Sequence, residues 1–290
     1  MSIKHPIVAV TGSSGAGTST VKNALEHIFH RIGARAAIVE GDSFHRYNRQ
    51  EMKEELAKAK LESRNLSHFG PEGNLFDKQL ELFQSYSRNG SGERRHYVHD
   101  ADEATSYGQE PGTFTPWEPL PQDTDLLFYE GLHGAVVTPE VDVAKYPDLL
   151  VGVVPVINLE WIQKLWRDKN MRGYSADAVT DTILRRMPDY VNYICPQFNH
   201  THVNFQRVPM VDTSNPFIAR DIPSADESMV VIRFANPKGI DFQYLRSMID
   251  GAFMSRANTI VVPGGKMELS MQLIFTPFVW RMMDRKKKAM

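Results

Sequence analysis

Residues 6–20 constrain the fold more than any other part of the chain, because an apolar run ends there in a cluster of glycines and hydroxyl side chains. The pattern is typical of a strand, a phosphate-binding loop and a helix. Gly12, Gly17 and Ser19 match the motif G-x-x-x-x-G-K-[ST], whose backbone N–H groups bind phosphate oxygens at a helix N-terminus. Thr18 stands where this motif has lysine. Taken alone, the loop also fits a dinucleotide-binding fold or a structural glycine-rich turn.

Predicted strands and helices alternate along the first half of the chain. Residues 21–32 carry apolar side chains at helical spacing and stop at Gly33, whereas residues 34–40 are typical of a buried strand. Apolar runs predict two more buried strands over residues 125–131 and 149–156. This alternation predicts an α/β fold with an open, mostly parallel sheet, in which ligands gather at the carboxyl ends of the strands.

The segment 41–49 concentrates reactive side chains at one such strand end. It holds the carboxylate of Asp42, the imidazole of His45 and the guanidinium of Arg49. These groups lie where we expect a substrate. Aspartate and serine are also ordinary turn and N-cap residues, so an unremarkable surface loop is the alternative.

The connection over residues 87–125 is rich in glycine, proline, serine and charge. A connection of this length inside a compact domain is usually functional or disordered. Within it, Tyr97 and His99 are candidates to contact substrate, and the alternative is that they are ordinary surface residues.

Glu130 ends the strand predicted over residues 125–131. At that position a carboxylate can hold Mg²⁺ directly or through water, as phosphoryl transfer from a triphosphate requires. An apolar strand that ends in glutamate is common. The prediction of a metal ligand therefore depends on the phosphate loop beside it.

A helix predicted over residues 158–172 carries a charged stripe at positions i, i+3, i+4 and i+8, formed by Lys164, Arg167, Asp168 and Arg172. Leu159, Ile162 and Trp166 fall on a different face. A solvated face with internal ion pairs has the same pattern. Because the phosphate loop lacks its lysine, the stripe is also a candidate source of positive charge for a transferred phosphate. Lys22, one turn after Thr18, is a second candidate, since helical side chains lean toward the N-terminus.

Composition limits the class of protein. The chain has 290 residues and a net charge of -2, and it has no long basic block, which argues against a nucleic-acid partner. We expect no membrane span, no secretory leader and a cytoplasmic location. Cys195 is the only cysteine, so we expect no intramolecular disulfide and a half-buried thiol. The lysines at 286–288 are expected to be solvated.

The order and approximate spacing of four motifs resemble those of the phosphoribulokinase and uridine kinase superfamily, and these motifs cover residues 12–19, 40–45, 128–132 and 167–173. Residues 203–217 and 260–267 are similar to the short, bacterial type of phosphoribulokinase. The resemblance implies a P-loop NTPase fold like that of nucleoside monophosphate kinases, with a mixed, mostly parallel sheet flanked by helices. It also implies transfer of the ATP γ-phosphate to O1 of ribulose 5-phosphate, which gives ribulose 1,5-bisphosphate for carbon fixation in the Calvin cycle.

The resemblance implies roles on the acceptor and metal side of the site. Asp42 is the expected general base on the sugar hydroxyl, and Asp168 is a second acid for metal or catalysis. His45 and Arg49 are expected to hold the sugar phosphate. Glu130 and Ser19 are expected to serve Mg²⁺.

On the nucleotide side, the resemblance places Lys164, Arg167 and Arg172 in or near a lid at residues 164–188 that closes on ATP phosphates. Lys164 is provisionally the substitute for the loop lysine. The loop residues expected to bind ATP are Gly12, Ser13, Ser14, Gly15, Ala16, Gly17, Thr18, Ser19 and Thr20.

The resemblance also carries expectations about regulation and assembly. The bacterial type is similar to enzymes that NADH activates and AMP inhibits, and that form large homo-oligomers. Arg31, Arg185 and Arg186 are candidate effector contacts, and ordinary surface arginines are the alternative. Plant members are switched by a cysteine pair, but Ala16 stands where we expect the loop cysteine, so that switch cannot operate here.

We expect one kinase domain over residues 1–290, with a core at 1–202 and a C-terminal extension at 203–290. The extension is predicted to add strands at 229–234 and 259–262 and a helix at 266–285 that is buried in the core or in a subunit contact.

Three other functions stay open at this point. Thr11 to Gly17 is close to the T-G-x-x-x-G-x-G loop of short-chain dehydrogenases, with Glu40 or Asp42 on a ribose hydroxyl. Its spacing is one residue short, and no tyrosine has a lysine four positions later. A uridine kinase-like enzyme is the second alternative. A nucleotide sensor without catalysis is the third, suggested by Thr18 alone.

Overall fold

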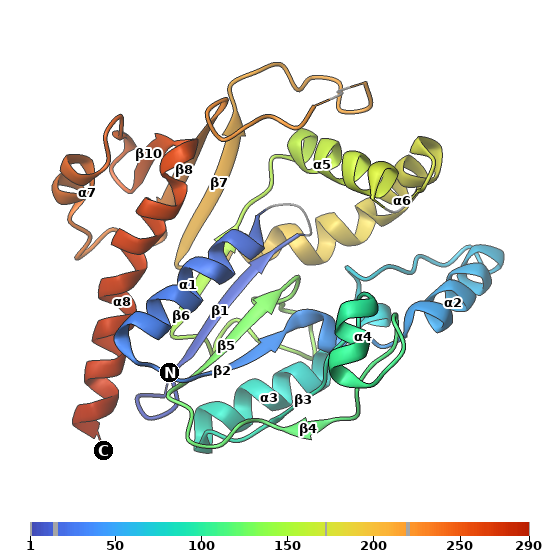
Figure 1. The fold of residues 1–290 in the computed structure, drawn as a ribbon, viewed down its shortest axis with the longest axis horizontal. Coiled ribbons are helices and arrows are strands. Elements are labelled where there is room, and N and C mark those ends of the chain that lie inside the picture. The colour runs from blue at the N-terminus through green and yellow to red at the C-terminus, as the bar shows by residue number, and fades with distance from the viewer. Residues whose placement is uncertain (1, 14–16, 172, 219–220, 290) are drawn as a thin grey trace.

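The computed structural model describes residues 2–13, 17–171, 173–218 and 221–289, and of Ser19 only the backbone (Figure 1). Within these residues one eight-stranded sheet has the order β2-β5-β1-β6-β7-β8-β10-β9. The first five strands are parallel and comprise β2 (Ala36–Glu40), β5 (Leu126–Gly131), β1 (Ile7–Gly12), β6 (Leu149–Val153) and β7 (Val203–Pro209). The last three strands are antiparallel to their neighbours and comprise β8 (Ser228–Phe234), β10 (Thr259–Pro263) and β9 (Phe253–Arg256). The predicted mixed, mostly parallel sheet is confirmed.

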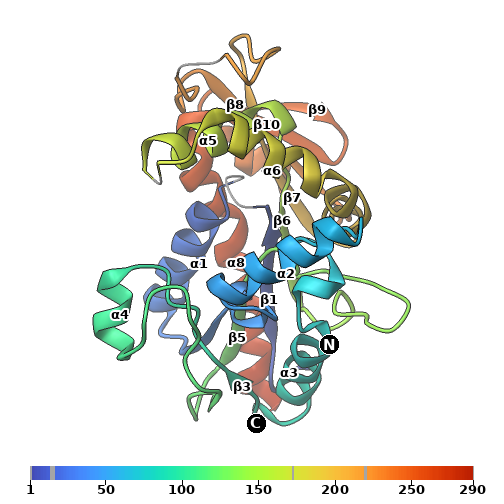
Figure 2. The same ribbon diagram turned by 90° about the vertical axis from the view of Figure 1, so that its right-hand side faces the viewer.

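Helices cover both faces of this sheet (Figures 1 and 2). Helix α1 (Thr18–Ile32) lies beside α8 (Met267–Ala289) on one face, and α3 (Phe76–Asn89) lies on the other. Alternate residues of β1 serve the two faces, because successive strand side chains point in opposite directions. Val10 packs in the core with α1 and α8, whereas Ala9 packs in the core with α3.

The remaining elements lie around this sandwich. They are α2 (Arg49–Leu61), α4 (Ala101–Tyr107), α5 (Ile157–Asn170), α6 (Ala176–Asp189), α7 (Phe242–Met248) and the two-stranded pair β3 (Glu93–Arg94) and β4 (Glu118–Pro119). Among the described residues, none of the helices is long and apolar enough to span a bilayer.

Two helix starts determine where the site forms. Helix α2 begins with a capping box, in which Asn48 Oδ1 accepts from the N–H of Glu51 at 2.9 Å and the Glu51 carboxylate accepts from the N–H of Asn48 at 2.8 Å. Helix α1 follows Gly17, whose φ of 101° favours glycine, and has no side-chain cap. The start of a helix is where backbone N–H groups can bind an anion.

The connection over residues 87–125 contains α4 and the β3–β4 pair. Three other expectations are corrected by the packing. Cys195 is exposed rather than half-buried. Lys286 is buried rather than solvated, because its ammonium donates to the carbonyls of Thr124 at 3.2 Å and Asp125 at 2.9 Å. Trp166 is 42% exposed, so it does not join the apolar face predicted for α5.

Candidate active site

A pocket of about 1370 Å³ opens at the carboxyl ends of β1, β2 and β5. Parallel strands bring these ends to one edge of the sheet, which is where such folds bind ligands. Most of the candidate residues line it, namely Gly12, Thr18, Lys22, Asp42, His45, Arg49, Tyr97, His99, Glu130, Lys164, Arg167 and Arg186. Ser13, Gly17, Thr20 and Asp168 do not line it, and neither do Arg31 and Arg185. Ser14, Gly15, Ala16, Arg172 and the side chain of Ser19 lie outside the described residues.

The described part of the phosphate loop is tightly packed. A Cβ on Gly12 would meet the Val153 carbonyl oxygen and the Thr18 methyl carbon, each at 2.8 Å, so this position requires glycine. Ser13 is fully buried. The Thr18 side chain, which replaces the lysine of the motif, acts on the Glu130 carboxylate and opposes the rise in its pKa. The end of the loop therefore lies near the acidic end of β5.

Carboxylates gather beside the loop. Glu40 and Glu130 are register partners on β2 and β5, and Lys22 forms an ion pair with Glu40. Burial raises the pKa of Glu130, and the charges of Asp42 and Glu40 raise it further. Burial is the largest influence on Glu40 and acts in the same direction, but the hydrogen bond and the charge of Lys22, together with smaller contributions from His99 and His96, lower the Glu40 pKa overall. Lys22 therefore stabilises the negative charge of Glu40, whereas the surroundings of Glu130 destabilise its negative charge.

We tested whether these side chains fit a magnesium ion. No cluster of three or more histidine, cysteine, aspartate or glutamate side chains is arranged to hold a metal within the part of the chain that the structure describes. Magnesium in kinases takes one or two carboxylates together with water and substrate phosphates, so a complete protein cage is not required. Glu130, half-buried next to other acids and facing the pocket, fits that need.

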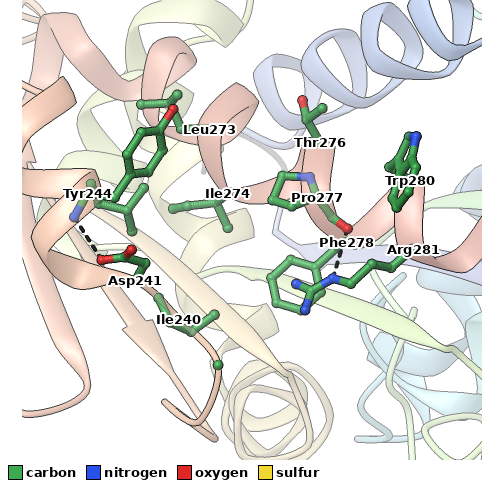
Figure 3. Close-up of a pocket in the computed structure, with 12 residues that line it drawn as sticks. Ile240, Asp241, Tyr244, Leu273, Ile274, Thr276, Pro277, Phe278, Trp280 and Arg281 are labelled. Atoms are coloured by element: carbon green, nitrogen blue, oxygen red, sulfur yellow. Dashed lines mark hydrogen bonds between the residues drawn. The ribbon is translucent and has the colours of Figure 1, made fainter.

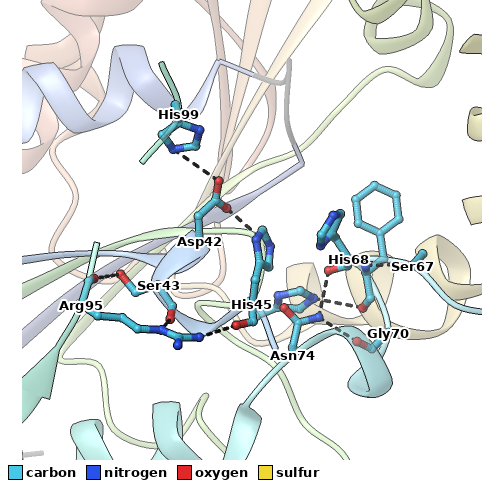
Figure 4. A network of polar contacts seen from close by, with 11 residues as sticks. Asp42, Ser43, His45, Ser67, His68, Gly70, Asn74, Arg95 and His99 are labelled. Atoms are coloured by element: carbon cyan, nitrogen blue, oxygen red, sulfur yellow. Dashed lines mark hydrogen bonds and ion pairs between the residues drawn. The ribbon is translucent and has the colours of Figure 1, made fainter. Parts of the chain in front are cut away.

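Asp42 lies between two histidines (Figure 4). Its Oδ1 is 3.6 Å from Nε2 of His45, and its Oδ2 is 3.7 Å from Nε2 of His99. Burial lowers the pKa of His45, although the Asp42 charge opposes the shift, so His45 is neutral at pH 7. The Asp42 side chain is 37% exposed and faces the pocket. A carboxylate in this position can accept a proton from a bound hydroxyl.

Arg49, the first residue of α2, contacts the connection over residues 87–125. Its Nη2 donates to the carbonyl of His99 at 2.9 Å, and its backbone N–H donates to the carbonyl of Gly112 at 2.8 Å. The Tyr97 and His99 rings pack edge to face, with centroids 4.9 Å apart. The structure therefore brings Asp42, Arg49 and His99 together from segments about fifty residues apart in sequence.

Helices α5 and α6 contribute cations from the opposite wall. Lys164, Arg167 and Arg186 line the pocket. Asp168 is buried instead, and it accepts from Lys164 Nζ at 2.5 Å and Arg167 Nε at 3.1 Å. Burial lowers the pKa of Lys164, and Arg186 and Arg167 act in the same direction. Asp168 thus pairs with two of the cations that line the pocket.

The candidate effector residues lie in different surroundings. Arg31, at the end of α1, donates to Thr276 Oγ1 of α8 at 2.8 Å. Arg185 Nη1 donates to the Leu66 carbonyl at 2.5 Å, whereas Arg186 faces the active-site pocket. Thr276 also lines a second cavity of about 580 Å³ between α7 and α8 (Figure 3). That cavity is mostly apolar, which separates it from the charged pocket at the strand ends.

His68 and Arg95 are among the residues of the site region that were not predicted. His68 lines the pocket with its ring tilted against that of His45, the centroids being 4.3 Å apart. Arg95 reaches the turn that carries Asp42 and His45 from the connection over residues 87–125. Neither residue belongs to a motif, and their partners are distant in sequence, so no local signal points to them.

Comparisons with known proteins decide the family. Residues 7–214 match the model of the Phosphoribulokinase / Uridine kinase family. The chain belongs to this family. A chromosomal phosphoribulokinase of Cupriavidus necator is 71% identical over 290 residues, with 100% of this chain and 99% of the relative covered. A phosphoribulokinase of Nitrobacter vulgaris is 63% identical over 287 residues, with 99% of both chains covered.

A solved structure confirms the fold of this family member. The phosphoribulokinase from Rhodobacter spheroides superposes with a TM-score of 0.91 at 56% sequence identity, covering 99% of this chain and 100% of the other. The predicted P-loop NTPase fold and kinase class are confirmed, and the short-chain dehydrogenase alternative is set aside.

Proposed function

We propose that this chain is a phosphoribulokinase, which transfers the γ-phosphate of ATP to O1 of D-ribulose 5-phosphate and so makes ribulose 1,5-bisphosphate. The observation that carries the mechanism is a single pocket that joins a phosphate loop to a carboxylate, Asp42, at adjacent strand ends. Similarity to proteins named phosphoribulokinase over the full chain supports this substrate over uridine.

ATP would place its phosphates at the loop over residues 12–20 and the N-terminus of α1. The transferred group spreads negative charge over its oxygens, and catalysis consists mainly of positioning and neutralising that charge. Lys164, Arg167 and Arg186 lie where they can do so from α5 and α6, and Arg172 would join them. Mg²⁺, when bound with the nucleotide, would supply further charge neutralisation. Glu130 and Ser19 are the residues we propose for it.

The sugar phosphate would occupy the opposite wall. His45, Arg49, Tyr97 and His99 would orient it, so that its O1 hydroxyl faces Asp42. Asp42 would accept the hydroxyl proton as the bond to phosphorus forms. A neutral His45 suits this arrangement, because an uncharged imidazole does not form an ion pair with the Asp42 carboxylate in competition with the substrate.

The charge of the missing loop lysine is proposed to come from Lys164. Both lysines are paired with a carboxylate, Lys22 with Glu40 and Lys164 with Asp168. Lys164 alone stands among further cations, since burial and the charges of Arg186 and Arg167 lower its pKa, and an anionic ligand would stabilise this group. Asp168 would then hold Lys164 and Arg167 in place. A direct role for Asp168 as a second acid is the alternative.

The finer expectations of the family resemblance are carried forward as proposals. They are a core at residues 1–202 with a lid near 164–188 and an extension at 203–290, a cytoplasmic homo-oligomer in the Calvin cycle, and regulation by NADH and AMP through Arg31, Arg185 or Arg186. The contacts of Arg31 and Arg185 with neighbouring segments are compatible with such effects on packing.

An ATP-dependent product assay tests the function. Purified protein is incubated with MgATP and ribulose 5-phosphate, uridine or pantothenate, and the phosphorylated product is identified. We expect product from ribulose 5-phosphate alone. Product only from uridine would make the chain a uridine kinase, and ATP binding without product from any acceptor would favour a nucleotide sensor.

A further inference from the structure

Arg95 holds the turn that carries the proposed base (Figure 4). Its Nε donates to the Ser43 carbonyl at 2.8 Å, and its Nη2 donates to the His45 carbonyl at 2.6 Å. In return, the Ser43 hydroxyl donates to the Arg95 carbonyl at 2.5 Å. Asp42 and His45 belong to this same short turn, which begins with the one-turn helix Gly41–Phe44. One guanidinium therefore fixes the backbone on both sides of Phe44.

The Arg95 guanidinium is itself held by aromatic rings. It lies 3.7 Å from the centroid of Phe114 and 4.8 Å from that of Trp117. Phe114 forms an isolated antiparallel bridge with Tyr97, beside which the N–H of Thr115 donates to the His96 carbonyl at 2.9 Å. A planar guanidinium can stack on a ring and donate two bonds from its edge at the same time, which an ammonium cannot do.

The position of Arg95 argues against direct contact with a ligand. Arg95 does not line the pocket, although Asp42, His45 and His99 do. Burial lowers the pKa of Arg95 to about 10, a cost that a residue needed only for solubility would not carry. Both of its side-chain hydrogen bonds go to backbone carbonyls of the turn.

We propose that Arg95 is a positioning residue that sets the geometry of Asp42 and His45 for phosphoryl transfer. The proposal rests on the function proposed above. A displacement of about 1 Å in a reacting group can cost about 10²-fold in rate, so a small movement of this turn matters. ATP binds at the other side of the pocket and should not sense the change.

Two substitutions at Arg95 and a neighbouring control test the proposal. Arg95→Lys keeps the positive charge but loses the paired hydrogen bonds and the guanidinium that stacks on the rings. Arg95→Ala removes the charge as well. Arg94→Lys is the matched control, because Arg94 lies next in sequence but bonds the Ile38 carbonyl and the Glu118 carboxylate. Steady-state kinetics, urea unfolding and the NMR signal of the His45 ring are measured for each variant. A His45→Asn variant assigns that signal.

We expect Arg95→Lys to lower kcat by about 10- to 10²-fold and to shift the His45 signal, while the KM for MgATP stays within about twofold. Arg94→Lys should match the wild type in kcat and in the position of the His45 signal. Equal effects of the two lysine variants, or a parallel rise in the KM for MgATP, would overturn the proposal. If Arg95→Ala does not fold, Arg95→Lys decides.

Failure of the two proposals can be told apart. A wild-type protein without activity on ribulose 5-phosphate would refute the function. The His45 signal then still tests Arg95, because an unchanged signal in Arg95→Lys contradicts a positioning role whatever the substrate.

Discussion

His133 makes the stability of the fold sensitive to acid. It lies just after β5, is 3% exposed, and its Nε2 is 3.0 Å from the Phe69 carbonyl oxygen. Its ring packs against Phe76 with centroids 4.8 Å apart. Burial lowers the pKa of His133 to about 3, and the hydrogen bond to Phe69 opposes the shift only in part. The folded protein therefore keeps this histidine neutral where the unfolded chain does not.

The size of the effect follows from proton linkage. A histidine in the unfolded chain takes up a proton near pH 6.5, so the unfolded state binds more protons than the native state between pH 6.5 and about 3. Stability consequently falls as the pH falls through this window. Between pH 7 and pH 5 the loss due to His133 alone is about 2 kcal/mol, since each unit below 6.5 costs about 1.4 kcal/mol.

A His133→Gln variant isolates this contribution, because glutamine keeps a donor for the Phe69 carbonyl but does not titrate. Urea unfolding is followed by tryptophan fluorescence at pH 7, 6 and 5 and at constant protein concentration. We expect the wild type to be the more stable at pH 7, with the difference shifting toward the variant by about 2 kcal/mol at pH 5. Other titrating groups are common to both proteins and cancel.

An exposed histidine on α1 provides the control. His27→Gln should leave the pH dependence of the wild type unchanged. A difference between wild type and His133→Gln that stays constant from pH 7 to pH 5 would refute the reasoning.

Two further predictions concern catalysis. Asp42→Asn should lower kcat by at least about 10²-fold with ATP binding nearly intact, because a positioned base contributes at least that much, and a normal rate would remove Asp42 from the role of base. Lys164→Met should lower kcat by about 10²- to 10³-fold, the range for loss of one charge-stabilising group, and more than Lys22→Met does. The opposite order in steady-state assays would assign the missing loop charge to Lys22.

The central elements of the fold could be predicted because their sequences carry the periodicity of buried strands and amphipathic helices. β1, β5 and β6 are fully or mostly buried, and their apolar runs are correspondingly continuous. Helix α4 has no such signal, since none of its seven residues is buried and its start depends on the Asp100 cap. The burial of Lys286 was unpredictable for a different reason, because its carbonyl partners lie more than 160 residues earlier.

Some residues of the candidate site could be predicted from sequence and others could not. Gly12, Asp42 and Glu130 were predicted together because parallel strands bring their carboxyl ends to one edge. Asp168 was expected to be a second acid for metal or catalysis, and that role stays a prediction. Its pairing with Lys164 and Arg167 follows from the charged stripe that these residues form on one helix. Arg95 could not be found from sequence, since its role depends on a connection that packs back onto the turn at residues 42–45.

The most direct test of the central claim is to identify the atom that receives the phosphate. Ribulose 5-phosphate labelled with ¹³C at C1 is incubated with MgATP and the protein, and the product is examined by ¹³C and ³¹P NMR. The account predicts a new phosphorus coupling at C1, together with one equivalent of ADP. ADP release without that coupling, or phosphorus at another carbon, would contradict it.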